Sequence, residues 1–154
     1  MDLSSILKPE AVKVISEASS KKRLFQRLGE AAESVYSLDG NQAAGALLER
    51  ENLGPTGVGP GIALPHARLN DATAVTGVFF KLERPLDFGA VDRQPVDLVF
   101  ALFAPENSGV EHLKALALIS RTMRNADICA KLRANDNPTT LHTVLTEGIA
   151  PQVA

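Results

Sequence analysis

The chain of 154 residues lacks the composition that marks several specialised classes of protein. It contains a single cysteine, so an internal disulfide and a cluster of thiolate metal ligands are both excluded. Tryptophan is absent and aromatic residues make up 5% of the chain, so we expect a core of Ala, Leu, Val and Ile. The net charge of −2 lacks the basic excess typical of nucleic-acid binders, and we expect no nucleic-acid partner.

Long apolar runs are missing as well. The most apolar stretch, PVDLVFALFAP at 95–105, contains Asp97 and is about half as long as a membrane-spanning helix needs. The N-terminus, MDLSSILKPE, has no basic segment followed by an apolar one, as a secretory signal peptide requires. We therefore predict a cytoplasmic protein without membrane insertion. The length suits one domain with a buried core, and we predict a single domain over 1–154.

Several catalytic motifs are also absent. The chain has no G-x-x-x-x-G-K-[ST] loop, and its glycines at 54–61 do not form G-x-G-x-x-G at the start of a helix, so direct use of a nucleotide is not expected. It has no H-E-x-x-H, and its three histidines are far apart, so we expect no metal site. A G-x-S-x-G hydrolase elbow is missing too. We therefore predict neither cofactor nor metal.

Helical and strand patterns interleave along the chain. The helix at 19–37 has Ser19 or Ser20 as its N-cap, and the helix at 108–134 begins with a capping-box pattern and breaks near Asn125. The strands are apolar over their whole length, which is typical of strands covered on both faces. We predict a three-layer α/β domain whose mixed, mostly parallel sheet is flanked by helices on both faces. The other predicted elements are helices at 39–52 and 137–148 and strands at 11–15, 61–66, 73–82 and 95–103.

The stretch GPTGVGPGIALPHARLN at 54–70 places His66 behind a loop dense in glycine and proline. The apolar segment at 61–66 predicts a short strand that ends at this histidine, and ligands of α/β sheets bind at strand ends. A lone histidine is more often structural than reactive. Here the loop favours a functional role, because a core histidine rarely needs so much turn-forming backbone before it.

Two further polar residues lie where they could serve an anion. If Ser108 is an N-cap, His112 falls in the first turn of its helix, where free N–H groups and the helix dipole favour negative charge. A solvated first-turn histidine is an equal alternative. Arg50 lies in the last turn of its helix, and a surface ion pair with Glu49 or Glu51 is the simpler interpretation of it alone.

Together, His66, His112 and Arg50 suit a phosphoryl group carried on a histidine. A neutral imidazole, whose ordinary pKa is about 6.5, is able to attack at neutral pH, and an arginine fork matches the oxygens of a transferring phosphoryl group. Transfer between two histidines requires no metal. His142 lies at the edge of an apolar helical face and Cys129 in an apolar stretch, so we interpret both as structural.

Three segments resemble a known family. ERENLGPTGVGPGIALPHARL, VDRQPVDLVFALFAP and GVEHLKALALIS are similar to the enzyme IIA family of the fructose/mannitol type in the bacterial phosphotransferase system. Within that family the chain most resembles the nitrogen-related branch. The similarity runs from about residue 3 to 146, and the family fold that it implies, a mixed sheet flanked by helices, agrees with the fold predicted from the strand and helix patterns.

The resemblance implies a role for each matching residue. His66, in the G-I-A-x-P-H motif, is the implied phosphorylated residue, while Arg50 and His112 are the implied active-site partners. Thr56 and Gly57 match the T-G of the family loop and are expected to support the loop at the phosphoryl group.

Two departures from the family pattern lie in the same stretch. Ala67 stands where the motif usually has glycine, and its Cβ disfavours a positive φ beside the phosphorylation site. Pro60 stands where a small polar residue is common. The loop is otherwise poor in charge, and we expect an apolar rim around the site, made by Val58, Ile62, Ala63 and Leu64.

The function implied by the resemblance is that of an enzyme, a phosphoryl-transfer component with a phosphohistidine intermediate. His66 would accept the phosphoryl group from a small histidine phosphocarrier protein (HPr-like), and the nitrogen-related branch implies regulatory target proteins bound according to phosphorylation state. One alternative is a sugar-transport IIA protein that donates to a cysteine of a separate IIB protein. Another is a binding module of the same fold without transfer. A histidine-dependent hydrolase is least supported, because no Ser or Cys nucleophile has a recognisable setting.

Overall fold

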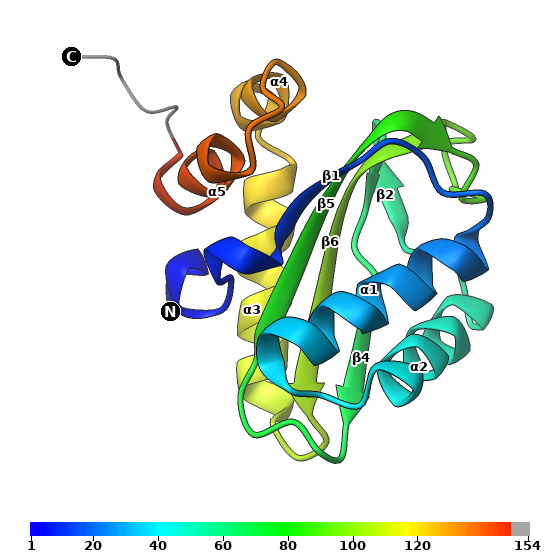
Figure 1. Cartoon of the computed structure of the whole chain (residues 1–154), viewed down its shortest axis with the longest axis vertical. Helices are drawn as coiled ribbons and strands as arrows, with labels where there is room; N and C mark the ends of the chain where they lie inside the picture. Colours follow the sequence, from blue (N-terminus) through cyan, green and yellow to red (C-terminus); the bar gives the residue numbers. More distant parts are fainter. Residues whose placement is uncertain (149–154) are drawn as a thin grey trace.

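The computed structural model describes residues 1–148, so the last six residues of the predicted domain lie outside the described range. The described chain forms three layers, with α1 and α2 on one face of a sheet and α3, α4 and α5 on the other (Figure 1). In chain order the elements are the 3₁₀ turns η1 (Leu3–Ser5) and η2 (Pro9–Ala11), β1 (Val12–Ile15), α1 (Lys21–Tyr36), α2 (Gly40–Asn52), β2 (Gly57–Gly59), β3 (Ile62–Ala63), β4 (His66–Leu69), β5 (Thr76–Leu86), β6 (Val96–Pro105), α3 (Gly109–Met123), α4 (Ala126–Arg133) and α5 (Pro138–Glu147).

The sheet within residues 1–148 has six strands in the order β1-β5-β6-β3-β2, and β4 pairs with β6 as well. The pairings of β1 with β5 and of β3 and β4 with β6 are parallel. Those of β5 with β6 and of β2 with β3 are antiparallel. Helices cover both faces, so β5 and β6 are buried along most of their length. The predicted three-layer α/β fold with a mixed, mostly parallel sheet is confirmed.

Most helix ends lie where the cap residues predict them. The Ser20 side chain accepts a hydrogen bond from the Arg23 N–H, and Asn125 separates α3 from α4 and caps α4. The predicted capping box at Ser108 is wrong. The Ser108 hydroxyl donates to the Pro105 carbonyl at 2.8 Å, because its backbone, with ψ 43°, lacks the extended conformation that aims an N-cap side chain at its helix.

The prediction of one strand that ends at His66 is also wrong. The segment divides into β3 and β4 at Leu64 and Pro65, and His66 is the first residue of β4. Proline has no N–H to donate to a neighbouring strand, so the ladder is interrupted there. Both pieces keep the same register on β6, with Ile62 opposite Leu98 and His66 opposite Leu102. The glycine-rich loop before them folds back as β2, a strand that the sequence did not predict.

Helices α1 and α2 are in backbone contact at two glycines. A Cβ on Gly29 would collide with the carbonyl oxygen of Gly40, and a Cβ on Gly40 would lie 2.9 Å from the carbonyl oxygen of Gly29. Only glycine at both positions allows the two backbones to come so near. This contact fixes the beginning of α2, whose other end carries Arg50.

The close contact predicts opposite effects for two glycine substitutions. Gly29→Ala should destabilise the fold by about 1–3 kcal/mol, because the new methyl group forces α1 and α2 apart. Gly45→Ala, in α2 with open space around its Cβ, should instead stabilise by about 0.5–1 kcal/mol through helix propensity. Urea unfolding of both variants measures the difference, and equal effects would show that the two helices are not in backbone contact.

Candidate functional site

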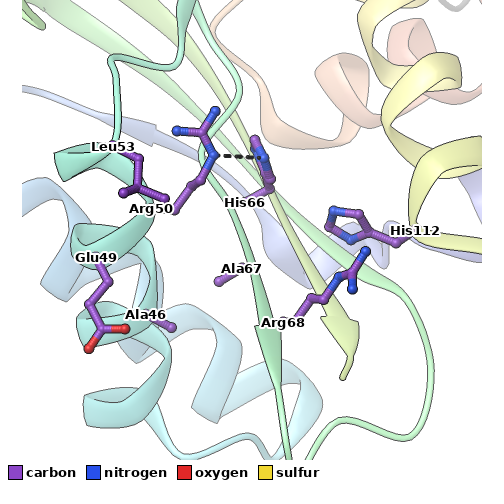
Figure 2. A pocket seen from close by; sticks show the side chains of 8 residues that line it. All are labelled: Ala46, Glu49, Arg50, Leu53, His66, Ala67, Arg68 and His112. Atoms are coloured by element: carbon purple, nitrogen blue, oxygen red, sulfur yellow. Dashed lines mark hydrogen bonds between the residues drawn. The ribbon is translucent and has the colours of Figure 1, made fainter. Parts of the chain in front are cut away.

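An open cleft of about 520 Å³ lies where the end of α2, the start of β4 and the first turns of α3 meet (Figure 2). Three residues far apart in the sequence, Arg50, His66 and His112, line it together, so the structure assembles the predicted constellation in one place. The complete lining is Ala46, Glu49, Arg50, Leu53, His66, Ala67, Arg68 and His112.

The His66 ring is held by the backbone. Its Nδ1 lies 2.9 Å from the Leu64 carbonyl oxygen, and because a carbonyl only accepts, Nδ1 carries the proton and Nε2 keeps a lone pair. The carbonyls of Gly61 and Pro65 accept from N–H groups of β6, so the alternation of a strand turns the Leu64 backbone away from β6. There its N–H donates to the Thr56 carbonyl and its own carbonyl is available to the ring.

Arg50 lies against the Nε2 side of that ring (Figure 2). Its Nε donates to His66 Nε2 at 3.2 Å, and its Nη1 donates to the Gly54 carbonyl at 3.0 Å. Within the described range Arg50 forms no ion pair with Glu49 or Glu51. The surface-pair interpretation of Arg50 is therefore wrong, and its charge faces the histidine.

His112 is buried on α3 beside His66. The two ring centroids are 5.7 Å apart with an interplanar angle of 53°, and His112 Nδ1 has no hydrogen-bond partner among residues 1–148. The backbone N–H of His112 donates to the Ser108 carbonyl at 2.8 Å. This residue therefore adds its side chain to the cleft, not a free backbone N–H of the helix. The alternative of a solvated first-turn histidine is wrong, because the side chain is enclosed.

The surroundings of both rings favour the neutral form. Burial lowers the pKa of His66 below its ordinary value, the hydrogen bond to Leu64 opposes that shift, and the charge of Arg50 lowers the pKa further. Burial also lowers the pKa of His112, followed by the effects of His66 and Arg68. Two neutral imidazoles beside arginine guanidinium groups can provide a nucleophilic nitrogen together with positive charge that attracts an anionic electrophile.

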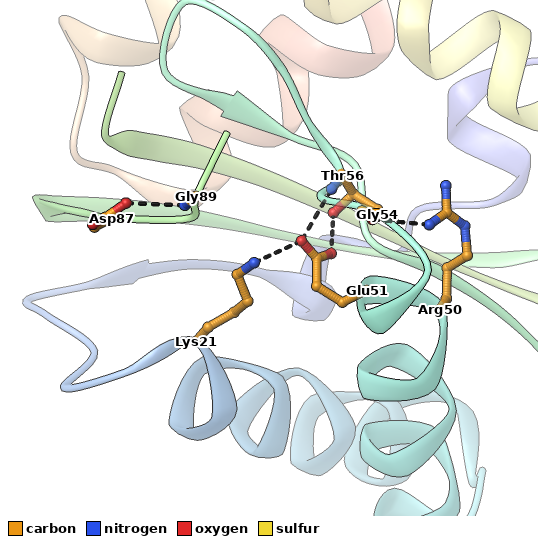
Figure 3. A network of polar contacts seen from close by, with 7 residues as sticks. All are labelled: Lys21, Arg50, Glu51, Gly54, Thr56, Asp87 and Gly89. Carbon is orange, nitrogen blue, oxygen red and sulfur yellow. Dashed lines mark hydrogen bonds and ion pairs between the residues drawn. The ribbon is translucent and has the colours of Figure 1, made fainter. Parts of the chain in front are cut away.

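A buried carboxylate anchors the loop beside the cleft (Figure 3). Glu51 accepts from the Thr56 hydroxyl at 2.6 Å, from the Thr56 N–H at 3.0 Å and from Lys21 Nζ at 2.8 Å. Thr56 is itself buried and does not line the cleft, so the hydroxyl serves the loop. A Cβ on Gly57 would lie 2.6 Å from the Ala90 Cβ, so glycine is required for this packing. Thr56 and Gly57 therefore fix the loop through contacts inside the protein and do not themselves line the cleft.

Two residues at the site were missed by the sequence analysis. Arg68 lines the cleft because it follows His66 by two positions and therefore shares its face of β4. Strand alternation places Arg68 in the cleft once a strand is known to begin at His66. Glu51 lies next to Arg50 on the helix, and only the folded loop reveals that it is buried among Thr56 and Lys21.

The prediction that Val58, Ile62, Ala63 and Leu64 form an apolar rim around the site is wrong. Ile62, Ala63 and Leu64 belong to the core, because the β2 hairpin and the sheet enclose them. Val58 is exposed but lines a different cavity. Exposed apolar side chains do occur near the cleft, at Leu53 in its lining and at Val110 and Leu113 in the first turns of α3.

The residues interpreted as structural have structural contacts. Nε2 of His142 lies 2.9 Å from the Leu7 carbonyl oxygen, and the buried Cys129 thiol donates to the Met123 carbonyl at 3.1 Å. Among residues 1–148 no group of three or more His, Cys, Asp and Glu side chains is placed to hold a metal ion. In the same range no helix has the length and apolar character needed to cross a membrane.

Comparisons with known proteins agree on one family. Residues 5–148 match the family model described as the phosphoenolpyruvate-dependent sugar phosphotransferase system, EIIA 2. The nitrogen regulatory protein of Bradyrhizobium diazoefficiens is 42% identical over 145 residues, covering 94% of this chain and 95% of that protein. The nitrogen regulatory protein of Escherichia coli K12 is 38% identical over 148 residues, 96% of this chain and 91% of that protein.

Solved structures give the same result. The crystal structure of the nitrogen regulatory protein IIA-Ntr from Neisseria meningitidis superimposes with a TM-score of 0.85 at 34% identity, covering 94% of this chain and 99% of that one. The IIA mannitol protein of Escherichia coli, in complex with phosphorylated IIB mannitol, has a TM-score of 0.72 at 20% identity, covering 94% of this chain and 100% of that chain. That second likeness is one of fold alone.

The carboxylate anchor predicts a large effect at one of two adjacent glutamates. Glu51→Ala should lower the free energy of unfolding by about 2–3 kcal/mol, because it leaves buried donors of Thr56 without an acceptor. Glu49→Ala, an exposed carboxylate one residue earlier, should change it by less than about 0.5 kcal/mol. Urea unfolding compares the two, and similar losses would contradict the anchoring role.

The lowered histidine pKa values predict an acid-dependent loss of stability. Between the lowered folded-state pKa and about pH 6.5, the unfolded chain binds more protons than the folded one. The two histidines therefore contribute stability above pH 6.5, and this contribution is lost as the pH falls through the folded-state pKa. His112→Asn should lose less stability than wild type between about pH 7.5 and about pH 5. Parallel stability curves for the two proteins in urea unfolding would refute the shift.

Proposed function

Because the chain belongs to the EIIA 2 family of the phosphoenolpyruvate-dependent sugar phosphotransferase system, we propose that His66 accepts a phosphoryl group on Nε2 from a small phosphohistidine carrier protein. The observation that carries this proposal is the hydrogen bond from His66 Nδ1 to the Leu64 carbonyl. It leaves Nε2 unprotonated, at an open cleft and beside an arginine. This function places the protein in the cytoplasm with its donor.

The transfer exchanges one P–N bond for another. The Nε2 lone pair of His66 attacks phosphorus, the P–N bond of the donor breaks, and its electron pair stays on the donor nitrogen. If the other ring nitrogen of the donor is protonated, the donor leaves as a neutral imidazole. The His66 ring gains the positive charge, which the Leu64 carbonyl stabilises through the Nδ1 proton.

Arg50 is placed to stabilise the transferred group. Its Nε contacts the nitrogen that attacks phosphorus, so an incoming phosphoryl group takes over that contact and its oxygens meet the guanidinium fork. The Gly54 carbonyl keeps the fork from turning away. His112, neutral and beside His66, is placed to donate to a phosphoryl oxygen or to orient the His66 ring. Thr56 and Gly57 support this site through the loop, not through contact with the phosphoryl group.

The output we propose is regulatory, through target proteins that bind according to phosphorylation state. Relatives named nitrogen regulatory protein reach 42% identity, whereas a relative named PTS system fructose-specific EIIA component, from Haloferax volcanii, is 33% identical over 95% of this chain and 96% of that protein. The apolar side chains of Leu53, Val110 and Leu113 provide a surface to which a donor or a target docks. A phosphoryl group beside them adds close to two negative charges.

The sugar-transport alternative differs in its acceptor. In that case phosphorylated His66 passes the group to a cysteine of a separate IIB protein, and the state of His66 selects no regulatory target. A binding module without transfer is less favoured, because Arg50, His66 and His112 are all present and meet in one cleft.

The proposed acceptor predicts which variants are labelled. Incubation with enzyme I, the histidine carrier and phosphoenolpyruvate should add one acid-labile phosphoryl group per chain, detected by intact mass, and His66→Ala should add none. Arg50→Ala should still be labelled, but about 10²–10³ times more slowly, because it lacks a preorganised charged donor.

The control is a second histidine of the same chain. His142→Gln should be labelled at the wild-type rate, because His142 lies on α5 against the Leu7 carbonyl and does not line the cleft. Labelling of His66→Ala would refute His66 as the acceptor. Loss of labelling in His142→Gln would point to His142 as the acceptor instead.

The proposed regulatory output predicts that a target binds according to the state of His66. Pull-downs from cytoplasmic extract should recover at least one target with the unphosphorylated protein and lose it on phosphorylation, through desolvation cost and charge repulsion. His66→Ala should retain that target under both conditions, and His66→Asp should bind it less. Moving a target from mostly bound to mostly free requires about 2–3 kcal/mol. Identical partners for all forms would favour the sugar-transport alternative.

A further inference from the structure

A second cavity lies on the other side of the β2–β3 hairpin, where it faces the junction of α3 and α4. Its volume is about 560 Å³, within the range of small-molecule pockets. It shares no lining residue with the His66 cleft. Its lining is Val58, Gly59, Pro60, Ile62, Ser120, Met123, Arg124, Ala126, Cys129, Ala130 and Arg133.

The walls of this cavity are mainly apolar and its charges have one sign. The buried side chains of Ile62, Met123 and Cys129 form its floor. Two arginines line it, and no carboxylate does. Such a cavity suits a ligand with an apolar body and an anionic head, since a neutral ligand leaves the positive field unused and a cation is repelled.

The two arginines differ in what already holds them. Arg133 donates to both carboxylate oxygens of Asp97 at 2.9 Å and to the Pro60 carbonyl at 2.8 Å, so its charge is largely neutralised. Arg124, the exposed C-cap of α3, makes no ion pair within residues 1–148. The head group of a ligand is therefore recognised chiefly by Arg124, whose fork matches a carboxylate.

The walls of the cavity are held by hydrogen bonds within the protein. The hydrogen bond from Arg133 to Pro60 ties α4 to the hairpin, and the pairing with Asp97 ties both to the start of β6. At Gly61, where φ is +78°, a Cβ would lie 2.6 Å from Arg133 Nη2, so the close approach requires glycine. Walls fixed in advance reduce the ordering cost of binding.

We propose that this cavity binds a small carboxylate with an apolar body, its carboxylate on Arg124 and its chain against Ile62, Met123 and Cys129. Because the cavity and the His66 cleft have separate linings, its occupancy is measured on the unphosphorylated protein with no phosphoryl donor present. Success or failure of that measurement is independent of the phosphoryl-transfer function.

The test is a titration followed by ¹H–¹⁵N chemical shifts, with octanoate as probe. Octanoate should bind with a Kd of about 1 mM or below, as expected for ten non-hydrogen atoms, and should shift the amides of Val58, Met123 and Ala130. 1-Octanol, which has the chain without the charge, and acetate, which has the charge without the chain, should each bind at least about tenfold more weakly.

Two variants locate the site and one controls for charge. Arg124→Gln should weaken octanoate about tenfold, and Ala130→Phe, at an exposed position of α4, should fill the cavity and abolish the shifts. Arg121→Gln removes an exposed arginine of α3 that does not line the cavity, and should bind octanoate as wild type does. Equal binding of octanoate and octanol, an equal effect of the Arg121 and Arg124 variants, or no shifts at the cavity would each overturn the proposal.

Discussion

The hydrogen bond between His66 Nδ1 and the Leu64 carbonyl is the contact on which the chemistry of the cleft depends. It leaves the proton on Nδ1 and the lone pair on Nε2, and it orients Nε2 toward Arg50. The bond exists because the backbone at Leu64 faces away from β6 and the β2 hairpin stops short of its carbonyl. The interruption at Pro65 is therefore part of the site, since sheet geometry and ring chemistry are set by the same two residues.

Two neighbouring residues of α2, Arg50 and Glu51, contact opposite sides of this site. Arg50 faces the cleft and Glu51 faces the protein, where it holds Thr56 and Lys21. The loop that follows α2 is thus held at two points. The Glu51 carboxylate holds Thr56, and the Arg50 guanidinium holds the Gly54 carbonyl. The position of the arginine is coupled to the shape of the loop, so a disturbance of either one reaches His66.

The fold and three of the site residues could be predicted from the sequence, because they leave local signals. Apolar runs of strand length, cap residues such as Ser20 and Asn125, and the motif around His66 are all short-range patterns. What the sequence could not provide depends on contacts between distant segments. The β2 hairpin, the burial of Glu51 and the enclosure of Ile62 all require the loop to fold back on the sheet.

Two errors have a common physical origin. The apolar run at 61–66 predicts one continuous strand up to His66, and the same apolar residues, in a loop poor in charge, predict an exposed rim that includes Leu64. Proline interrupts such an element, and a hairpin that covers it turns an apparent surface into core. Arg68 was overlooked for the converse reason, since alternation along β4 matters only once the start of that strand is known.

The backbone contact between Gly29 and Gly40 has a mechanical consequence at the other end of α2. Arg50 is ten residues from Gly40, a lever of about 15 Å at the rise of an α-helix. A tilt of about 4° at the glycine pair therefore moves the guanidinium by about 1 Å, a displacement able to cost about 10²-fold in the rate of the phosphoryl transfer that we propose. The pivot of this lever is main chain against main chain, which has no side-chain rotamers through which it could relax.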